Sequence, residues 1–390
     1  GLINKVARLE NDCLMPLIRA ELNGIPVNPS IFDDKPDMQE NVASLEERFI
    51  TEYALKPTQV SKIKEMLEDD FDLHLDDMKK TTLEKFRSVV PVAEVLEYRN
   101  AVSGLKFLDR IEKLLQDGKL YTSFSQISAP SGRMATRPSV QSIPRSLKKK
   151  IYLPPDGWKI IRGDFPAIEL RLAAIKAGEN NLIEAFQQGK DPHRMTASGL
   201  SGKPESMIGD DDAERKIAKA CNFGFLYGMW IISFILYAVQ LVGRLLSEKE
   251  AETYRNQFFK SYPQLEKWHR ETKRRLKKLG DVGVVSTLYG RKVKIDKYTL
   301  ALNVPVQGSG ADLIKDALIR FDKAIIEAGL SARIINIIHD EIVVMAPDNE
   351  VEQVKGLLRT AMESAADDMI GLFHTPVEPV VFGRNGVKEN

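Results

Sequence analysis

A polar triplet interrupts the most apolar stretch of this 390-residue chain. In "ARIINIIHDEIVVMAP" (332–347), His339, Asp340 and Glu341 stand between runs of Ile and Val that favour buried strands. A buried charge is costly unless it is paired or holds a metal. The ordinary interpretation is a β-hairpin whose turn is solvated, and the functional one is a cation site at the end of a strand.

A second carboxylate site occurs in "GWKIIRGDFPAIELRLAAIKAG" (157–178). The run "KIIRGD" predicts a strand that ends at Asp164, and Pro166 suits the start of the helix that follows. Glu169 then falls one turn into that helix, and Gly178 is expected to end it. The ordinary alternative is that Asp164 caps the helix.

The two sites together indicate metal chemistry. Asp164 and Asp340 are 176 positions apart (340 − 164), yet each is expected at the end of an apolar strand. If the strands are neighbours in one sheet, both carboxylates meet at one edge. Oxygen ligands of this kind suit Mg²⁺, which binds one or two carboxylates together with water and substrate phosphates. Two such ions can activate an attacking oxygen and stabilise a leaving one.

A third site lies in "AERKIAKACNFGFLYGMW" (213–230), where Arg215, Lys219, Phe223 and Tyr227 recur every four residues. This spacing places them on one broad face of a helix. The cations suit a polyphosphate, and the aromatic rings offer flat surfaces for a base. Ordinary core packing is the alternative for the two aromatic residues.

Three weaker motifs carry polar side chains, of which Asn303 and Gln307 stand one helical turn apart with donors suited to base edges or sugar. A lone His is more often structural than functional, turn and capping chemistry is the alternative for Asn303 and Gln307, and none of the three motifs is specific alone. They are "DPHRMTA" with His193, "NVPVQGSGADLIKDAL" with Asn303 and Gln307, and "SGRMATRPSVQSIP" with Arg133 and Gln141.

Composition is that of a globular protein with 43% hydrophobic and 28% charged residues. No stretch approaches the length of a membrane-spanning helix, and charges in the N-terminal residues argue against a signal peptide. Cys13 and Cys221 cannot form a disulfide framework, so we expect a reducing, cytoplasmic compartment. The net charge of +1 hides basic clusters such as "RSLKKK" (145–150) and "KRRLKK" (273–278).

Hydrophobic spacing predicts an α+β pattern with a helical insertion rather than strands and helices that alternate along the chain. We expect two blocks of strands separated by about a hundred helical residues. The expected elements are a helix within 1–30, mostly helices in 37–118, short extended pieces in 120–165, helices in 183–280, strands in 282–345 with one helix at 310–328, and a final extended "VEPVVF".

In its motifs the chain resembles the polymerase portion of family A DNA polymerases, the bacterial polymerase I type. Five stretches carry the resemblance in order: "SGRMATRPSVQSIP", "DFPAIELR", "RKIAKACNFGFLYG", "NVPVQGSGADL" and "HDE". The resemblance implies a right-hand architecture with an antiparallel-sheet palm, helical fingers and a helical thumb. The palm would combine 1–30, 120–190 and 299–390, the thumb would be 31–119, and the fingers would be 191–298.

The resemblance also implies roles for individual residues. Two Mg²⁺ ions would be held by Asp164, Asp340 and the Phe165 carbonyl, with Glu341 beside them. Lys219 would serve catalysis as well as nucleotide binding. The nucleotide site would comprise Arg215, Lys219, Phe223, Tyr227, His193 and Glu169, which selects deoxynucleotides, and the primer–template site Arg133, Gln307, Asn303 and His339.

The chain departs from the family pattern at several positions. The family usually has Asp-Tyr-Ser-Gln-Ile-Glu where this chain has "DFPAIE", so Pro166 and Ala167 replace side chains that hydrogen-bond near the nucleotide. Thr299 stands where an Arg is expected, and the usual C-terminal Trp is missing. These departures fit a divergent branch, viral and organellar branches included, and bear on fidelity rather than on catalysis.

We therefore expect a template-directed DNA polymerase that adds dNTPs to a primer 3′ end by two-metal nucleotidyl transfer. Its expected partners are primer–template nucleic acid and dNTP, without a membrane, and it is expected to be a monomer. No counterpart of the family's proofreading domain is expected in this chain. A single-subunit RNA polymerase of the phage type and a non-catalytic primer–template-binding protein are the alternatives.

Overall fold

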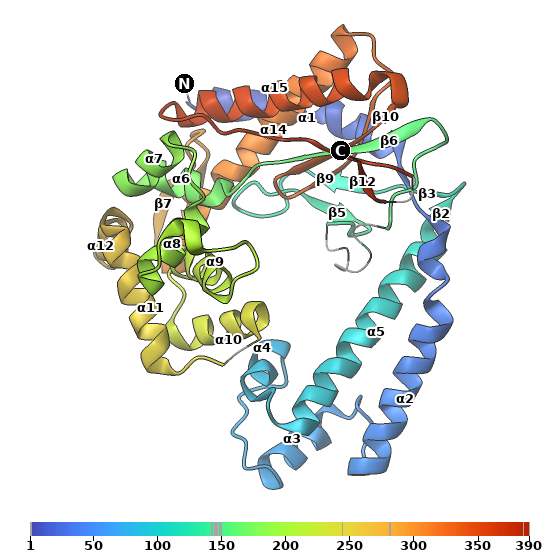
Figure 1. Ribbon diagram of the computed structural model, residues 1–390, viewed down its shortest axis with the longest axis vertical. Helices are drawn as coiled ribbons and strands as arrows, with labels where there is room; N and C mark the ends of the chain where they lie inside the picture. Colours follow the sequence, from blue (N-terminus) through green and yellow to red (C-terminus); the bar gives the residue numbers. More distant parts are fainter. Residues whose placement is uncertain are drawn as a thin grey trace. The chain divides into compact units, whose positions relative to one another are not determined.

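The computed structural model describes residues 2–141, 143, 147, 150–243, 245–280, 282–384 and 386–389. The chain forms two compact units, which are described separately (Figure 1). Most of the basic stretch 145–150 lies outside the described residues. Unit 1 comprises Gly1–Pro26, Tyr121–Ile143 and Tyr152–Asn390, and unit 2 comprises Val27–Leu120 and Pro144–Ile151.

A five-stranded antiparallel sheet forms the centre of unit 1, with the strand order β12-β11-β6-β10-β9. In its middle, β6 pairs with β10 so that Asp164 stands opposite Glu341. The strands that end at Asp164 and begin after Asp340 are therefore neighbours, which meets the condition under which both carboxylates lie at one edge of the sheet. The bounds are β6 (Trp158–Asp164), β9 (Arg333–Ile338), β10 (Glu341–Pro347), β11 (Val380–Phe382) and β12 (Lys388–Glu389).

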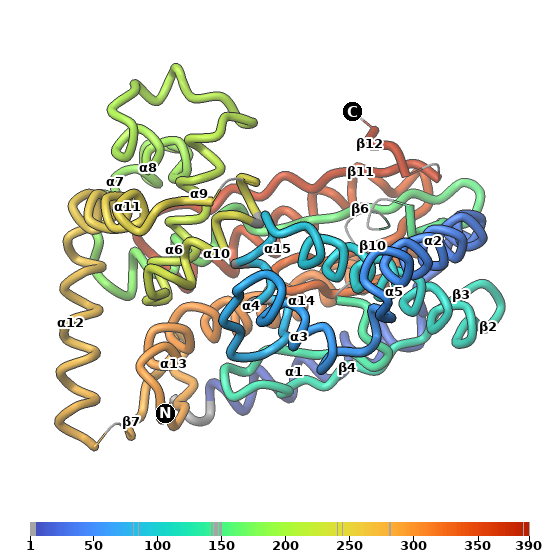
Figure 2. The backbone as a smooth tube through the Cα atoms, turned by 90° about the horizontal axis from the view of Figure 1, so that it is seen from below, coloured from blue at the N-terminus to red at the C-terminus, as the bar shows by residue number. Residues whose placement is uncertain are grey.

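Two long helices, α14 (Ser309–Glu327) and α15 (Val351–Ile370), run side by side and contact the sheet (Figures 1 and 2). Gly163 of β6 allows α15 to lie close, because a Cβ there would stand 2.9 Å from Met362 Sδ. No element is expected from the sequence for the α15 segment. Its signal is nevertheless regular, since apolar residues recur at helical spacing and are buried against the sheet and α14.

The helical run before β9 starts earlier than the sequence predicts. Instead of one helix at 310–328, the structure has α13 (Tyr298–Asn303), a π-helical turn at Val304–Gly308, and then α14. Pro305 and two valines give this segment poor helix propensity. Burial of Leu302, Val304 and Val306 overrides that local preference.

The helical insertion packs around aromatic side chains. Phe225 of α9 lies 4.2 Å from Phe234 of α10 and 5.8 Å from Phe258 of α11, measured between ring centroids. Gly224 lets α10 approach, because a Cβ there would stand 3.1 Å from Phe234. The bounds are α6 (Ile168–Ala177), α7 (Asn180–Gln187), α8 (Pro192–Ser201), η3 (Glu205–Met207), α9 (Ala213–Leu226), α10 (Ile231–Val242), α11 (Glu248–Ser261) and α12 (Pro263–Lys278).

The remaining elements of unit 1 are the N-terminal helix, short strands and a short 3-10 helix. The N-terminal helix contacts α14, and its Arg19 forms an ion pair with Asp322. No helix among the described residues is long and apolar enough to cross a membrane. The bounds are α1 (Leu2–Asn23), β1 (Ile25–Pro26), β4 (Ser123–Ser125), β5 (Ala135–Arg137), β7 (Gly283–Ser286), β8 (Lys292–Ile295) and η5 (Asp348–Glu350).

Unit 2 is mostly helical, as the sequence predicts. Its long helices α2 and α5 pack together, and Lys35 at the start of α2 lies 2.8 Å from Asp109 of α5. Phe49, Leu67 and Leu96 belong to its buried core. The bounds are η1 (Pro29–Phe32), α2 (Lys35–Tyr53), α3 (Val60–Asp69), α4 (Lys80–Leu83), η2 (Glu84–Phe86), α5 (Val90–Leu114), β2 (Leu115–Gln116) and β3 (Lys119–Leu120).

Candidate active site

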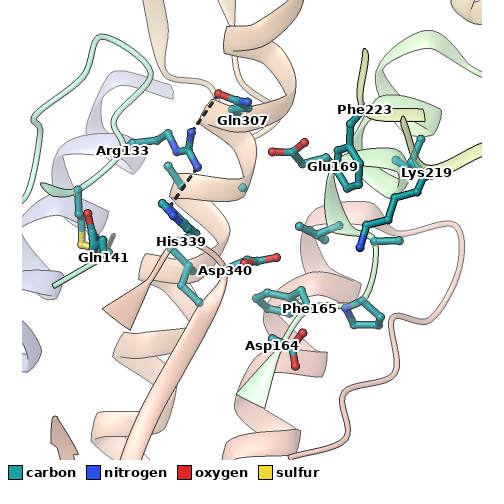
Figure 3. A pocket seen from close by; sticks show the side chains of 18 of the residues that line it. Arg133, Gln141, Asp164, Phe165, Glu169, Lys219, Phe223, Gln307, His339 and Asp340 are labelled. Atoms are coloured by element: carbon teal, nitrogen blue, oxygen red, sulfur yellow. Dashed lines mark hydrogen bonds between the residues drawn. The ribbon is translucent and has the colours of Figure 1, made fainter. Parts of the chain in front are cut away.

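A cavity of about 380 Å³ in unit 1 gathers most of the residues that the sequence singles out. The ends of β6 and the β9–β10 turn form one side, α6 and α9 another, and the π-helical turn with α14 a third (Figure 3). Lys219 extends into the cavity across from Asp340 in this view. The predicted site residues that line it are Arg133, Gln141, Asp164, Phe165, Glu169, His193, Lys219, Phe223, Gln307, His339 and Asp340.

The two aspartates are brought together by strand pairing. Asp164 is the last residue of β6, and Asp340 is in the two-residue turn between β9 and β10. The backbone N–H of Phe165 donates to the Asp340 carbonyl at 3.4 Å, which joins the end of β6 to this turn. His339 has a φ of 57°, so the turn contains a left-handed residue. The hairpin interpretation is thus right about the backbone, while Asp340 faces the cavity rather than open solvent.

The surroundings of Asp340 oppose its negative charge. Burial raises the pKa of Asp340 to about 6, and the nearby carboxylates of Asp164, Glu169 and Glu341 act in the same direction. Acids placed together in this way need a positive counter-charge when they ionise. The site therefore has the electrostatic character of a cation-binding site.

Glu341 has a different environment from the two aspartates. It lies in β10, is buried, and forms an ion pair with Arg162 of β6. Glu341 is absent from the residues that line the cavity. Its charge is thereby partly neutralised by the protein itself, whereas Asp164 is exposed at the end of the strand.

The connection from β6 to α6 differs from the expected one. The helix begins at Ile168 rather than at Pro166, and its first turn is preceded by Ala167 in the left-handed region with a φ of 50°. The N-cap position is occupied by Ala167, so the alternative in which Asp164 is the N-cap residue is wrong. Gly178 ends the helix with a φ of 65°, as predicted.

Glu169 and Tyr227 form a partly buried pair at the edge of the cavity. Burial raises the pKa of Glu169, and Tyr227 and the charge of Arg133 oppose that shift. The pKa of Tyr227 lies well above its ordinary value, because of burial and then the charge of Glu169. Asn303 Oδ1 is buried without a hydrogen bond to any described residue, and neither Tyr227 nor Asn303 lines the cavity.

Arg133 links the two sides of the cavity. Its guanidinium donates to Gln307 Oε1 at 3.2 Å and lies 3.4 Å from His339 Nδ1 (Figure 3). Three residues from separate segments therefore form one polar row, although each motif was weak alone. Gln141 lines the same cavity and donates to the Ile337 carbonyl at 3.3 Å.

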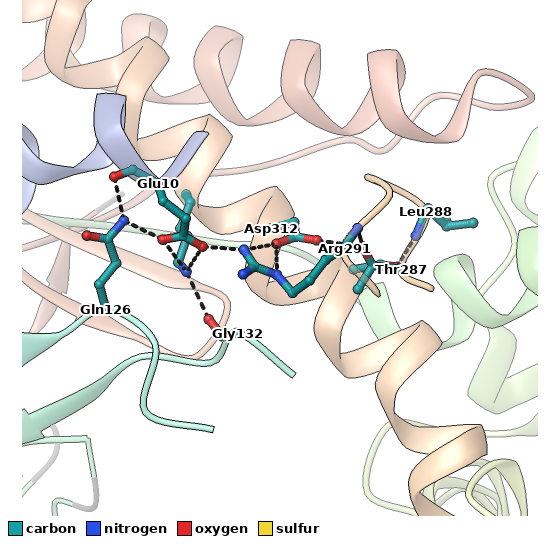
Figure 4. A network of polar contacts seen from close by, with 9 residues as sticks. Glu10, Gln126, Gly132, Thr287, Leu288, Arg291 and Asp312 are labelled. Carbon is teal, nitrogen blue, oxygen red and sulfur yellow. Dashed lines mark hydrogen bonds and ion pairs between the residues drawn. The ribbon is translucent and has the colours of Figure 1, made fainter. Parts of the chain in front are cut away.

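A buried charged network holds the segment that carries Arg133 (Figure 4). Lys315 of α14 is fully buried and donates to the Gly132 carbonyl at 2.9 Å and to Glu10 at 2.7 Å. Asp312 accepts from the Arg291 Nε at 2.9 Å, and Arg291 also pairs with Glu10. Two cations and two carboxylates compensate one another, which makes their burial tolerable.

On the α9 side, the cations and the histidine have distinct roles in the fold. Arg215 donates to Asp191 through Nη2 at 2.8 Å and does not line the cavity. Lys219 is exposed and lines it together with Phe223. His193 is buried, and its ring centroid lies 5.9 Å from that of Phe223.

The donor set fits a cation that takes few protein ligands. Among the described residues there is no group of three or more His, Cys, Asp or Glu side chains placed to hold a metal. Two carboxylates with open space between them and Lys219 suit Mg²⁺, which keeps water and substrate phosphate oxygens in its coordination sphere. The residues that could hold such an ion are Asp164, Asp340 and the Phe165 carbonyl.

Sequence reasoning missed three polar residues that support the site. Arg162 pairs with Glu341, Asp191 holds Arg215, and Asn222 contacts the His193 ring. The signal for Asn222 was present, because it is a polar residue between the apolar positions of α9. The partner of each of these residues depends on the tertiary fold.

Comparison with known proteins identifies the class of this fold. The solved POL domain of Pol1 from M. smegmatis, in complex with DNA primer-template and dNTP, superimposes with a TM-score of 0.85. The match covers 97% of this chain and 70% of that one, at 23% sequence identity. The fold is therefore that of a polymerase domain, as predicted.

The family follows from the sequence comparisons. The family model for DNA polymerase family A matches residues 36–377, and the chain belongs to this family. DNA polymerase I of Aquifex aeolicus is 33% identical over 96% of this chain and 66% of its own length. The thermostable DNA polymerase I of Thermus filiformis is 33% identical over 73% of this chain and 35% of its length. The chain thus spans between a third and two thirds of these relatives.

Proposed function

We propose that this chain is a template-directed DNA polymerase that adds dNTPs to the 3′ end of a primer. The observation that carries the proposal is the meeting of Asp164 and Asp340 at the ends of paired strands, across a cavity from Lys219. Membership of DNA polymerase family A supports the same reaction. The M. smegmatis domain with primer-template and dNTP supports the same classes of ligand.

In this proposal Asp164, Asp340 and the Phe165 carbonyl hold two Mg²⁺ ions. Bound there, the ions would lower the pKa of the primer hydroxyl and neutralise charge on the phosphates. Lys219 and His193 bind the triphosphate from the α9 side, and Arg215 exchanges Asp191 for a phosphate when nucleotide is present. Glu341 remains with Arg162 and assists through its charge.

The other residues of the cavity select and position the substrates. Phe223 supports the incoming base and sugar, and Tyr227 holds the template-base position before the nucleotide enters. Glu169 crowds the sugar 2′ position and so favours deoxynucleotides. The row Arg133, Gln307 and His339, with Asn303 behind it, contacts the primer–template near the new pair, because its donors suit groove edges.

The proposed domain assignment follows the expected right-hand architecture of palm, fingers and thumb. The palm comprises 1–30, 120–190 and 299–390, the fingers 191–298, and the thumb 31–119. The palm assignment is supported by the central sheet, and the thumb assignment by the separate helical unit 2. The protein acts on soluble nucleic acid as a monomer in a cytoplasmic compartment.

Primer extension tests the proposal. The wild-type protein should extend a labelled primer on a DNA template with dNTPs and Mg²⁺, and Asp340→Ala should abolish extension while duplex binding persists. Asp348→Ala, an exposed acid in η5, serves as the matched control and should extend normally. Extension by Asp340→Ala near the wild-type rate would refute the metal-site assignment.

The same assay separates the alternatives. Dominant incorporation of rNTPs would identify a phage-type RNA polymerase instead. Binding of primer–template without extension in the presence of Mg²⁺ would identify a non-catalytic binding protein.

A further inference from the structure

Within the helical insertion, a buried row of hydrogen-bonded side chains ends at the imidazole of His193. Asn222 of α9 is fully buried, and its Nδ2 lies 2.8 Å from His193 Nδ1. On the other side, Asn222 Oδ1 accepts from Thr196 Oγ1 at 2.9 Å. Thr196 Oγ1 in turn lies 2.7 Å from the buried Tyr262 hydroxyl. Three of these residues, Asn222, Thr196 and Tyr262, do not line the cavity, whereas His193 does.

The donors and acceptors in this row of side chains determine which nitrogen of the His193 ring carries the proton. An amide nitrogen only donates, so His193 Nδ1 must accept from Asn222, and a neutral ring then carries its proton on Nε2. The other end of the amide bears on its orientation. Thr196 Oγ1 lies 2.8 Å from the Pro192 carbonyl as well as 2.9 Å from Asn222 Oδ1, and its one hydrogen serves either acceptor. Asn222 Nδ2 faces His193 in the arrangement in which Thr196 donates to Asn222 Oδ1 and accepts from the Tyr262 hydroxyl.

The position of this proton matters because the ring is neutral at physiological pH. Burial lowers the pKa of His193 to about 4, the cations Lys219 and Arg215 on α9 act in the same direction, and Asp191 opposes them. A neutral imidazole has one N–H and one lone pair. Phosphate oxygens accept hydrogen bonds, so only the Nε2–H form presents a donor to a polyphosphate in the cavity.

We propose that Asn222 is a positioning residue that fixes His193 as the Nε2–H tautomer, so that the ring donates to the phosphates of the incoming nucleotide. The inference rests on the proposed polymerase function, in which this cavity takes a nucleoside triphosphate. Asn222 itself does not touch the substrate. It acts by excluding the tautomer in which the ring would present a lone pair to phosphate.

The tautomer can be measured on the wild-type protein without substrate. The chain has five histidines, so long-range ¹⁵N–¹H correlation of ¹⁵N-histidine-labelled protein gives few ring signals, and His193→Gln assigns one set. We expect a protonated Nε2 and an unprotonated Nδ1 for His193 at pH 7.5. A protonated Nδ1 would overturn the proposal.

A double-mutant cycle tests the effect on nucleotide binding. Asn222→Leu should raise the KM for dNTP about 5- to 15-fold, as expected for the loss of one hydrogen bond of about 1–1.5 kcal/mol, with a smaller change in kcat. In a His193→Ala background the same substitution should have little further effect. An equal loss in both backgrounds would mean that Asn222 only supports helix packing, and would refute the proposal.

Asn222→Asp provides a variant of the same size with the opposite hydrogen-bonding character. A carboxylate at this position accepts from Nδ1–H, so the ring should donate to phosphate only while it is doubly protonated. The KM for dNTP of this variant should therefore rise with pH, while Lys219, Arg215 and Asp191 around the ring keep their charges. A KM that does not change with pH would count against the proposal.

These outcomes are separable from failure of the proposed function. If the wild-type protein extends no primer, the polymerase assignment fails, whatever tautomer the spectrum reports. If it extends primers and His193 carries its proton on Nδ1, only the role of Asn222 fails.

Discussion

Replacing Asp340 by Asn should stabilise the metal-free protein while it abolishes primer extension. Burial raises the pKa of Asp340 from 3.8 to about 6, and the carboxylates of Asp164, Glu169 and Glu341 contribute to the shift. At 1.36 kcal/mol for each pKa unit, ionising Asp340 in the folded state costs about 3 kcal/mol relative to the unfolded chain. The neutral amide of Asn avoids this cost.

The sign of the effect depends on pH. The pKa of Asp340 is higher in the folded than in the unfolded state, so folding favours its protonated form. The corresponding stabilisation is fully present below pH 3.8 and is lost as the pH rises through about 6. Asp340→Asn should therefore increase the free energy of unfolding by about 3 kcal/mol at pH 8 and by less than about 1 kcal/mol at pH 4.

Urea unfolding in EDTA at the two pH values measures this difference. Asp211→Asn, an exposed acid before α9, is the matched control and should change stability by less than about 0.5 kcal/mol at either pH. Added Mg²⁺ should stabilise the wild type more than the Asp340→Asn variant, because the ion binds only the folded state. A variant no more stable than wild type at pH 8, or equally stabilised at both pH values, would refute the reasoning.

Three further predictions concern selectivity, packing and the buried network. Glu169→Ala should improve the ratio of rNTP to dNTP incorporation about tenfold or more in single-nucleotide kinetics, and an unchanged ratio would remove Glu169 from the sugar site. Gly163→Ala should lower the free energy of unfolding by about 1–3 kcal/mol, because its Cβ would overlap α15 side chains. Gly157→Ala is the comparison, because a Cβ there meets open space but the φ of 72° strains the backbone, so it measures strain without a clash. Asp312→Ala should cost about 3–5 kcal/mol in urea unfolding, since it leaves buried Arg291 short of a partner, and a loss below 1 kcal/mol would show that the network relaxes.

Many residues of the candidate site could be predicted from their types and from their positions along the sequence. The period of four in α9 placed Lys219 and Phe223 on one face, and the cavity contains both. The strand-like runs before Asp164 and around Asp340 predicted two strands, and the structure shows that β6 and β10 are neighbours in one sheet. The helical start at Tyr298 was missed, because burial of its apolar residues outweighs the low helix propensity around Pro305.

Which polar groups became partners could not be predicted locally. The pairing of Glu341 with Arg162 follows from the register of β6 on β10, and that of Arg215 with Asp191 from the packing of α8 on α9. Neither pair has a sequence spacing from which it could be inferred. The contact of Asn222 with His193 likewise joins two helices that no local pattern relates.

The amino-acid order was enough to identify the chemical groups, the helical insertion between two blocks of strands, and the family to which the motifs point. The folded chain was needed to show that burial opposes the ionisation of Asp340 and that Glu341 is already paired. The difference arises because side-chain periodicity is a local property of the backbone. Desolvation and charge pairing depend instead on which distant segments pack around a group.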